Sequence, residues 1–159
     1  MAFSRIYSKI IALVILSVSP GLSQAHSVAC FTGNMGQFCM ELLERQAPGT
    51  VANFIRYIDS GAYAQSIFHR SVPGFVIQGG GFKVANSDTG VTASKVSTFD
   101  PIVNEFGISN MRGTVAMAKV GGDPDSATSQ WFVNLKNNSV IHDNQNGGFT
   151  VFAKILFKG

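Results

Sequence analysis

The chain has 159 residues, of which 45% are hydrophobic and 13% charged, and its formal net charge is +3. Two basic residues, Arg5 and Lys9, lie in a leader-like segment that has no acidic residue, so the rest of the chain carries a charge of +1. It contains no block of like charges and no basic stripe interleaved with aromatic residues. We therefore expect no nucleic-acid partner and no attraction to an anionic membrane surface.

The first 25 residues have the layout of a cleaved secretory signal peptide. After the two basic residues, an apolar run extends over residues 10–18, Pro20-Gly21 ends it, and small residues follow at Ser23 and Ala25. A membrane-spanning helix needs roughly 20 apolar residues, about twice this run, so a permanent anchor is the disfavoured alternative. The segment predicts cleavage after Ala25 and one exported domain over residues 26–159, periplasmic or secreted, with no stable membrane association.

The next predicted elements are two strands, Val28 to Thr32 and Gln37 to Leu43, joined by a tight turn. A two-residue turn at Asn34-Met35 pairs residues whose numbers sum to 69, so Cys30 faces Cys39. Alternation makes this a non-hydrogen-bonded pair with a Cα separation of about 4.5 Å, at the short end of disulfide geometry. Because an exported chain enters an oxidising compartment, we expect a disulfide, and two free buried thiols are the alternative.

One segment has helical periodicity, and the rest of the domain is predicted as short strands. Apolar residues recur at helical spacing after Pro48, and Gly61 supplies a stop. The later strands, bounded by Gly, Pro, Asn and Asp, are Ile67 to Arg70, Phe75 to Gln78, Thr114 to Ala118, Gln130 to Leu135 and Phe149 to Phe157. The predicted fold class is mostly β, an antiparallel β-barrel with a capping helix.

The most informative segment is FHRSVPGFVIQGGGF, from Phe68 to Phe82. Arg70 and Gln78 are polar side chains in an otherwise apolar hairpin, with Pro73-Gly74 at its turn and three glycines at its end. A shared polar task explains this pair better than two independent solvated side chains. The pattern is suited to holding an apolar group next to hydrogen-bond donors.

This segment resembles the signature of the cyclophilin family of peptidyl-prolyl cis/trans isomerases. The resemblance continues, in the family's order, in TVAMAK from Thr114, SATSQWFVNL from Ser126 and NGGFTVFAKI from Asn146. It is closest to bacterial exported members, and it implies a barrel of eight strands closed by two helices, with the substrate groove on its outer surface. Family members continue beyond Phe157-Lys158-Gly159 into a second helix and a closing strand. We therefore expect a domain that lacks both and self-associates through open sheet edges, whereas a complete domain is expected to be a monomer.

The reaction that the resemblance implies is rotation about an X-Pro amide bond. The barrier for peptide bonds is about 18 to 20 kcal/mol, and no covalent bond is made or broken. The reaction needs no metal, cofactor or nucleophile, and the cysteines and histidines share no metal-ligand spacing. It needs an apolar pocket for the proline ring and a donor that favours the twisted amide over the planar one. The expected partners are proline-containing unfolded or loop segments of exported proteins, and an X-Pro-binding module or holdase with little turnover is the alternative.

The resemblance assigns site residues from the positions that they occupy in the family's motifs. The resemblance assigns catalysis to Arg70, with Gln78 holding the substrate backbone and orienting the arginine. The remaining substrate-binding residues that it implies are Phe75, Val76, Ala118, Lys119, Gln130, Phe132, Ile141 and Phe149. The loose alignment of residues 140–146 fixes Ile141 only to within one position. For Phe75 and Phe132 taken alone, ordinary barrel core is the alternative.

Overall fold

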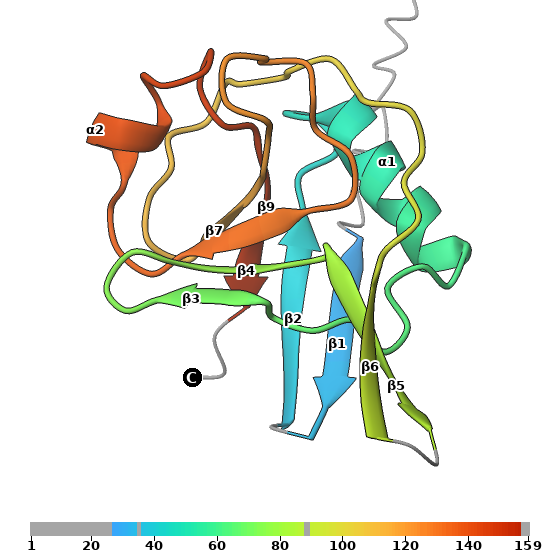
Figure 1. The fold of residues 1–159 in the computed structure, drawn as a ribbon. Coiled ribbons are helices and arrows are strands. Elements are labelled where there is room, and N and C mark those ends of the chain that lie inside the picture. Colours follow the sequence, from blue (N-terminus) through green and yellow to red (C-terminus); the bar gives the residue numbers. More distant parts are fainter. Residues whose placement is uncertain (1–26, 35, 88–89, 157–159) are drawn as a thin grey trace, which may run out of the picture.

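Most of the domain is one curled antiparallel sheet (Figure 1). The computed structural model describes residues 27–34, 36–87 and 90–156, so the predicted signal peptide lies outside the described residues. The strand order is β1-β2-β9-β7-β8-β4-β3, with β1 and β3 at the edges. The strands are β1 (Val28–Gly33), β2 (Gly36–Leu42), β3 (Arg70–Val72), β4 (Val76–Gly79), β7 (Thr114–Met117), β8 (Trp131–Asn134) and β9 (Val151–Leu156). The prediction of a mostly-β antiparallel fold is confirmed.

The predicted helix is also confirmed, as α1 (Pro48–Asp59), a helix of 12 residues with proline in its first turn. Its first backbone N–H groups are not capped by a neighbour in sequence. Instead, the Glu105 carboxylate accepts hydrogen bonds from Gly49 N at 3.0 Å, Thr50 N at 2.7 Å and Thr50 Oγ1 at 2.7 Å. Within the described ranges, no helix is long and apolar enough to cross a membrane.

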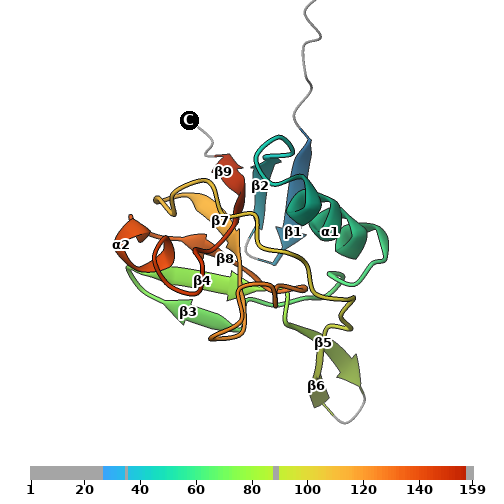
Figure 2. The same ribbon diagram turned by 90° about the horizontal axis from the view of Figure 1, so that it is seen from above.

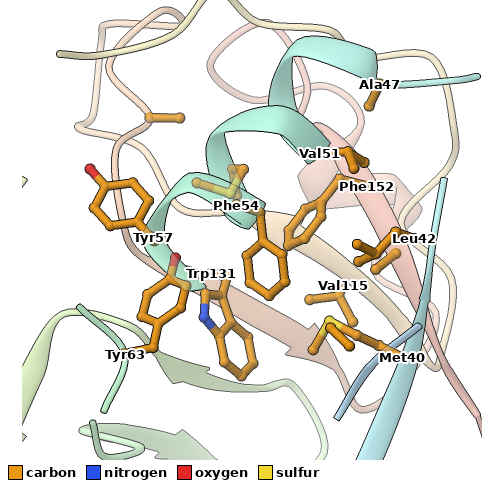
Figure 3. Packing of buried hydrophobic residues seen from close by; sticks show 14 of the residues in the cluster. Met40, Leu42, Ala47, Val51, Phe54, Tyr57, Tyr63, Val115, Trp131 and Phe152 are labelled. Carbon is orange, nitrogen blue, oxygen red and sulfur yellow. The ribbon is translucent and has the colours of Figure 1, made fainter. Parts of the chain in front are cut away.

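The main core lies between α1 and the inner face of the sheet (Figure 3). Phe54 is fully buried at its centre, with ring centroids 4.9 Å from Phe152 and 5.5 Å from Tyr63. Trp131 from β8 packs edge-on against Phe54 at 6.4 Å. These aromatic contacts come from the helix, from two strands and from the segment that follows the helix, so they fix α1 on the sheet.

The β1–β2 hairpin has the predicted register. Gly33 pairs with Gly36 and Cys30 with Cys39, and the two cysteines form a disulfide with a Cα separation of 4.1 Å. Cys30 is exposed and Cys39 is half-buried. Both the pairing and the bond that the sequence predicts are therefore present.

The strand predicted over Ile67 to Arg70 is wrong in its position, because β3 begins only at Arg70. The residues before Arg70 bond to two different strands. His69 N donates to Gln78 O of β4 at 3.1 Å, whereas Ile67 N donates to Phe82 O, outside the main sheet, at 3.0 Å. This segment therefore crosses from the main sheet to a second one. Its apolar residues gave a strand pattern although they pair with two different partners.

Two elements were not predicted, a β-ribbon and a short helix. Strands β5 (Phe82–Ser87) and β6 (Gly90–Lys95) form a separate two-stranded sheet that projects from the body of the domain (Figure 2). Strand β6 is exposed along its whole length, and the short alternation of Val91 and Ala93 with polar residues is too weak a pattern to predict a strand. Helix α2 (Ser139–His142) has four residues and is too short to show a helical period.

Strand β8 divides the domain into two faces by simple alternation. Trp131 and Val133 belong to the main core, whereas Phe132 belongs to a second apolar cluster on the outer face. Asn134 lies two residues beyond Phe132 and is buried on the same side. The outer face of β8 and its neighbours carries the candidate site.

Candidate functional site

The centre of the candidate site is a group of four rings, Phe75, Phe132, His142 and Phe149, which we call the ring cluster. The His142 ring centroid lies 5.0 Å from Phe75, 4.9 Å from Phe132 and 5.1 Å from Phe149. Phe132 is buried, while Phe75 and Phe149 are half-buried and keep part of their rings accessible. The predicted apolar site residues that the structure brings together here are Phe75, Val76, Ala118, Phe132 and Phe149.

A row of polar side chains runs beside the ring cluster. The β3–β4 register places Arg70 opposite Gln78, and the β4–β8 register places Gln78 opposite Phe132. Arg70 Nη1 makes a long 3.4 Å contact to Gln78 Oε1, and Gln78 Nε2 donates to Gln130 Oε1 at 2.9 Å. Arg70 is exposed, so donors of its guanidinium fork remain available at the surface. Three of the predicted polar residues therefore form one connected row.

Lys119, another of the predicted substrate-binding residues, binds three oxygen atoms of the chain itself. Its ammonium donates to Gly148 O at 2.6 Å, Asn146 O at 2.8 Å and Asn104 Oδ1 at 3.2 Å, which uses all three N–H donors. It also lies 5.1 Å from the centroid of the Phe149 ring. Lys119 thus holds the segment that carries Phe149.

The structure places His142, and not Ile141, in the ring cluster. Ile141 is 39% exposed, whereas His142 is 6% exposed. Helix α2 turns the histidine inward: His142 N donates to Asn138 O at 2.8 Å, and Asn138 Nδ2 donates to Phe75 O at 3.0 Å. The substrate contact that the resemblance implies for Ile141 stays a prediction, and the structure adds His142 as the residue that lies among the three phenylalanine rings.

A buried polar network that was not predicted lies beneath the ring cluster, centred on Asn134. Its Nδ2 donates to Asn110 Oδ1 at 3.0 Å and to Thr114 Oγ1 at 2.9 Å. Its Oδ1 accepts a hydrogen bond from Asn138 Nδ2 at 2.8 Å and lies 3.1 Å from His142 Nδ1. The spacing from Phe132 could have revealed Asn134, because residues two apart on a strand share a face. The network fixes the orientation of the histidine ring.

Burial and nearby charges set the ionisation of His142. Burial lowers the pKa of the His142 imidazole, the Asp143 carboxylate raises it, and the Arg70 guanidinium lowers it further; the net shift is downward. Burial raises the pKa of Asp143, but hydrogen bonds from Ser109 and Asn110 lower it more. At neutral pH the site therefore combines a neutral imidazole with a charged guanidinium.

Two cavities lie away from the ring cluster. One of about 300 Å³ has Phe38 and Ile77 in its wall, and another of about 470 Å³ lies between β1 and α1. No residue of the ring cluster lines either of them. A ligand of the ring cluster would contact the half-buried residues Phe75 and Phe149 from the outer face.

The fold and the site together define a class of protein: an antiparallel β domain that presents an aromatic cluster beside an exposed arginine on its outer face. Such a site can hold an apolar ring and donate hydrogen bonds next to it. A sequence profile described as "Cyclophilin type peptidyl-prolyl cis-trans isomerase/CLD" matches residues 28–159. The chain belongs to this family and is an enzyme of the peptidyl-prolyl cis-trans isomerase class.

Individual relatives agree with this membership. A peptidyl-prolyl cis-trans isomerase A of Dickeya dadantii (strain 3937) is 36% identical over 157 residues, which cover 96% of this chain and 78% of that protein. Peptidyl-prolyl cis-trans isomerase B of Escherichia coli (strain K12) is 38% identical over 132 residues, 79% of this chain and 76% of that protein. A crystal structure of a cyclophilin-type isomerase from Cryptosporidium parvum has a TM-score of 0.64 at 27% identity and covers 84% of this chain and 80% of that one.

A second crystal structure of the Cryptosporidium parvum isomerase was determined in the presence of the dipeptide Ala-Pro. Its TM-score is 0.61 at 27% identity, and the match covers 82% of this chain and 78% of that one. At this identity the likeness extends beyond the fold to a recognisable sequence relationship. It relates this chain to a family member whose structure was determined in the presence of a proline-containing dipeptide.

Proposed function

We propose that the chain isomerises X-Pro bonds in extended segments of exported polypeptides, with Arg70 as the catalytic donor. The observation that carries the proposal is the placement of an exposed guanidinium across one hairpin from Gln78, on the strand next to Phe75 and Val76. The arginine also lies near enough to His142 for its charge to affect that imidazole. One donor and one apolar cluster thus occupy the same surface.

The proposed mechanism is non-covalent. Accessible parts of the ring cluster hold the proline ring, and this contact is equally good in the planar and the twisted amide. Twisting removes amide resonance and restores the nitrogen lone pair, which Arg70 can then hydrogen-bond. Because this hydrogen bond is made only with the twisted amide, it lowers the barrier. Gln78 holds the guanidinium, and Gln130 in turn holds Gln78.

The exported role rests on the sequence of residues 1–25 and on the disulfide. Disulfides persist in oxidising compartments such as the periplasm or the extracellular space, and the Cys30–Cys39 bond suits either one. Assistance to the folding of exported proteins is the role that this location favours. The N-terminal sequence of the mature protein tests it: we expect a start at His26, and mature protein that retains Met1 would exclude export by this signal.

The catalytic proposal is tested with Arg70→Ala, Arg70→Lys and Phe75→Ala in an isomerisation assay on a short Ala-Pro peptide. Arg70→Ala should lower kcat/KM by about 10²- to 10³-fold, chiefly through kcat. Arg70→Lys should rescue poorly, because a point charge lacks the planar fork. Phe75→Ala should weaken binding as well as catalysis. Unchanged peptide affinity is expected for Arg70→Ala.

The matched control is Arg56→Ala. Arg56 is an exposed arginine on α1 whose guanidinium lies 3.7 Å from the centroid of the Phe99 ring, on an element that packs against the core face of the sheet. Its loss should leave kcat/KM within about twofold of the original value. Full isomerase activity in folded Arg70→Ala protein would refute the mechanism and leave the surface as a docking site for X-Pro segments.

A further inference from the structure

We infer that His142 is a substrate-binding residue of the isomerase site, and that the site binds an X-Pro segment well only while this imidazole is neutral. The inference rests on the proposed use of the ring cluster to hold proline. It concerns a residue that the sequence motifs did not single out. The argument follows from the hydrogen bonds of the ring, its surroundings and the charges around it.

The hydrogen-bond network determines which nitrogen of His142 carries the proton. Asn134 Nδ2 already donates twice, to Asn110 and to Thr114, so its amide orientation is fixed and Oδ1 is an acceptor. His142 Nδ1 lies 3.1 Å from that Oδ1 and must donate to it. In the neutral ring, Nε2 is then an unprotonated acceptor.

His142 Nε2 faces away from the network and is open to the surface. Among the described residues, the buried side-chain polar atoms without a partner belong to His69, Trp131 and Asn138. Nε2 of His142 is not one of them, and no hydrogen bond within that part of the chain reaches it. The nitrogen is therefore accessible, while three phenylalanine rings pack around the imidazole about 5 Å away. A proline ring on these phenylalanines would cover it.

Protonation of Nε2 would change this surface from apolar to cationic. An apolar ring that covers a protonated imidazole removes its hydration without supplying an acceptor, and this is costly. The charged groups around the ring are Arg70 on β3, Lys119 across the Phe149 ring, and Asp143 next in sequence. The Asp143 carboxylate is already bonded to Ser109 and Asn110. A protonated His142 would thus add a cation beside the catalytic guanidinium.

The consequence is that substrate binding weakens at acid pH as His142 becomes protonated, which we call the acid limit. Below the pKa of His142, which burial holds under its usual value of 6.5, the fraction of neutral imidazole falls tenfold per pH unit. We expect kcat/KM to fall with the same slope. The loss should appear in KM, with kcat within about twofold, because the neutral form that binds is unchanged in its chemistry.

The first experiment is a protease-free isomerisation assay between pH 5 and 8, with an Ala-Pro peptide that has no titratable side chain. His142→Leu keeps an apolar wall and should give kcat/KM flat within about twofold over this range. His142→Gln serves the same purpose if the leucine variant does not fold. His69→Gln is the matched control, because His69 is half-buried outside the ring cluster and its variant should retain the acid limit. Emission of Trp131, the only tryptophan, reports at each pH whether the domain is folded.

The second experiment needs no substitution at His142. The pKa of its imidazole is followed by NMR in the free protein and with saturating Ala-Pro peptide. Linkage requires the peptide to lower this pKa if the neutral form binds more tightly. An unchanged or raised pKa would overturn the inference, as would an acid limit that persists in His142→Leu and His142→Gln. Absence of turnover by the original chain at every pH would instead refute the proposed function, while a peptide-induced fall in the pKa would still support the role of His142 in binding.

Discussion

Reduction of the Cys30–Cys39 bond offers a quantitative test of how the first hairpin is stabilised. The bond joins residues nine apart and closes a loop of about ten residues in the unfolded chain. The loop-entropy relation gives about 9 cal/mol/K for such a loop, or about 2.7 kcal/mol at 25 °C. Because domains of this size are stable by about 5 to 15 kcal/mol, the bond accounts for a large part of the free energy of unfolding.

Urea titrations followed by Trp131 fluorescence measure this difference. The oxidised protein, the reduced protein and the Cys30→Ser/Cys39→Ser variant are compared, and the last two should unfold about 2 to 3 kcal/mol more easily. Isomerase activity of the folded reduced protein should be unchanged, because β1 and β2 lie at the opposite end of the sheet from β4 and β3. Coincident midpoints for the oxidised and reduced forms would refute the entropic reasoning.

Two further substitutions test the polar contacts that hold loops onto the sheet. Lys119→Met should lower the free energy of unfolding by about 2 kcal/mol, because three oxygen acceptors lose a charge-assisted donor; a urea midpoint equal to that of the original chain would contradict this. Glu105→Gln should cost about 1 kcal/mol at pH 7, where the carboxylate binds the start of α1. Burial raises the pKa of Glu105, but hydrogen bonds from Thr50 and Gly49 lower it overall, so its stabilising effect is present above pH 4.5 and is lost as the pH falls through the lowered value. The difference between variant and original should therefore disappear once the pH is below the lowered pKa of Glu105, and a difference that stays constant through acid pH would refute the assignment.

The sequence predicts best those elements whose pattern is local. The turn between Cys30 and Cys39 fixes a register by counting alone, and the helical spacing of apolar residues after Pro48 favours a helix. The position of β3 is less local, because residues before Arg70 bond to two different sheets. The β5–β6 ribbon has no buried face along β6, and its apolar residues are too few to predict a strand.

The same distinction holds for the candidate site. Arg70 and Gln78 lie in one hairpin with a recognisable turn, so their proximity follows from the sequence. The inward turn of His142 depends on a one-turn helix and on its bond to Asn134, eight residues earlier. Lys119 shows a further limit: its motif position is clear, yet its partners come from segments 15 to 29 residues away. Contacts of this kind form only when distant loops pack against each other, so the local sequence does not reveal them.

Strand β8 couples the main core to the candidate site. Trp131 and Val133 pack into the main core, and the intervening Phe132 and the following Asn134 support the site. A substitution on one side of the strand therefore displaces the other side by way of a shared backbone. Second-site substitutions that restore activity to Phe132 variants are to be sought among the core residues behind this strand. Libraries that vary substrate preference should randomise both faces of β8 together.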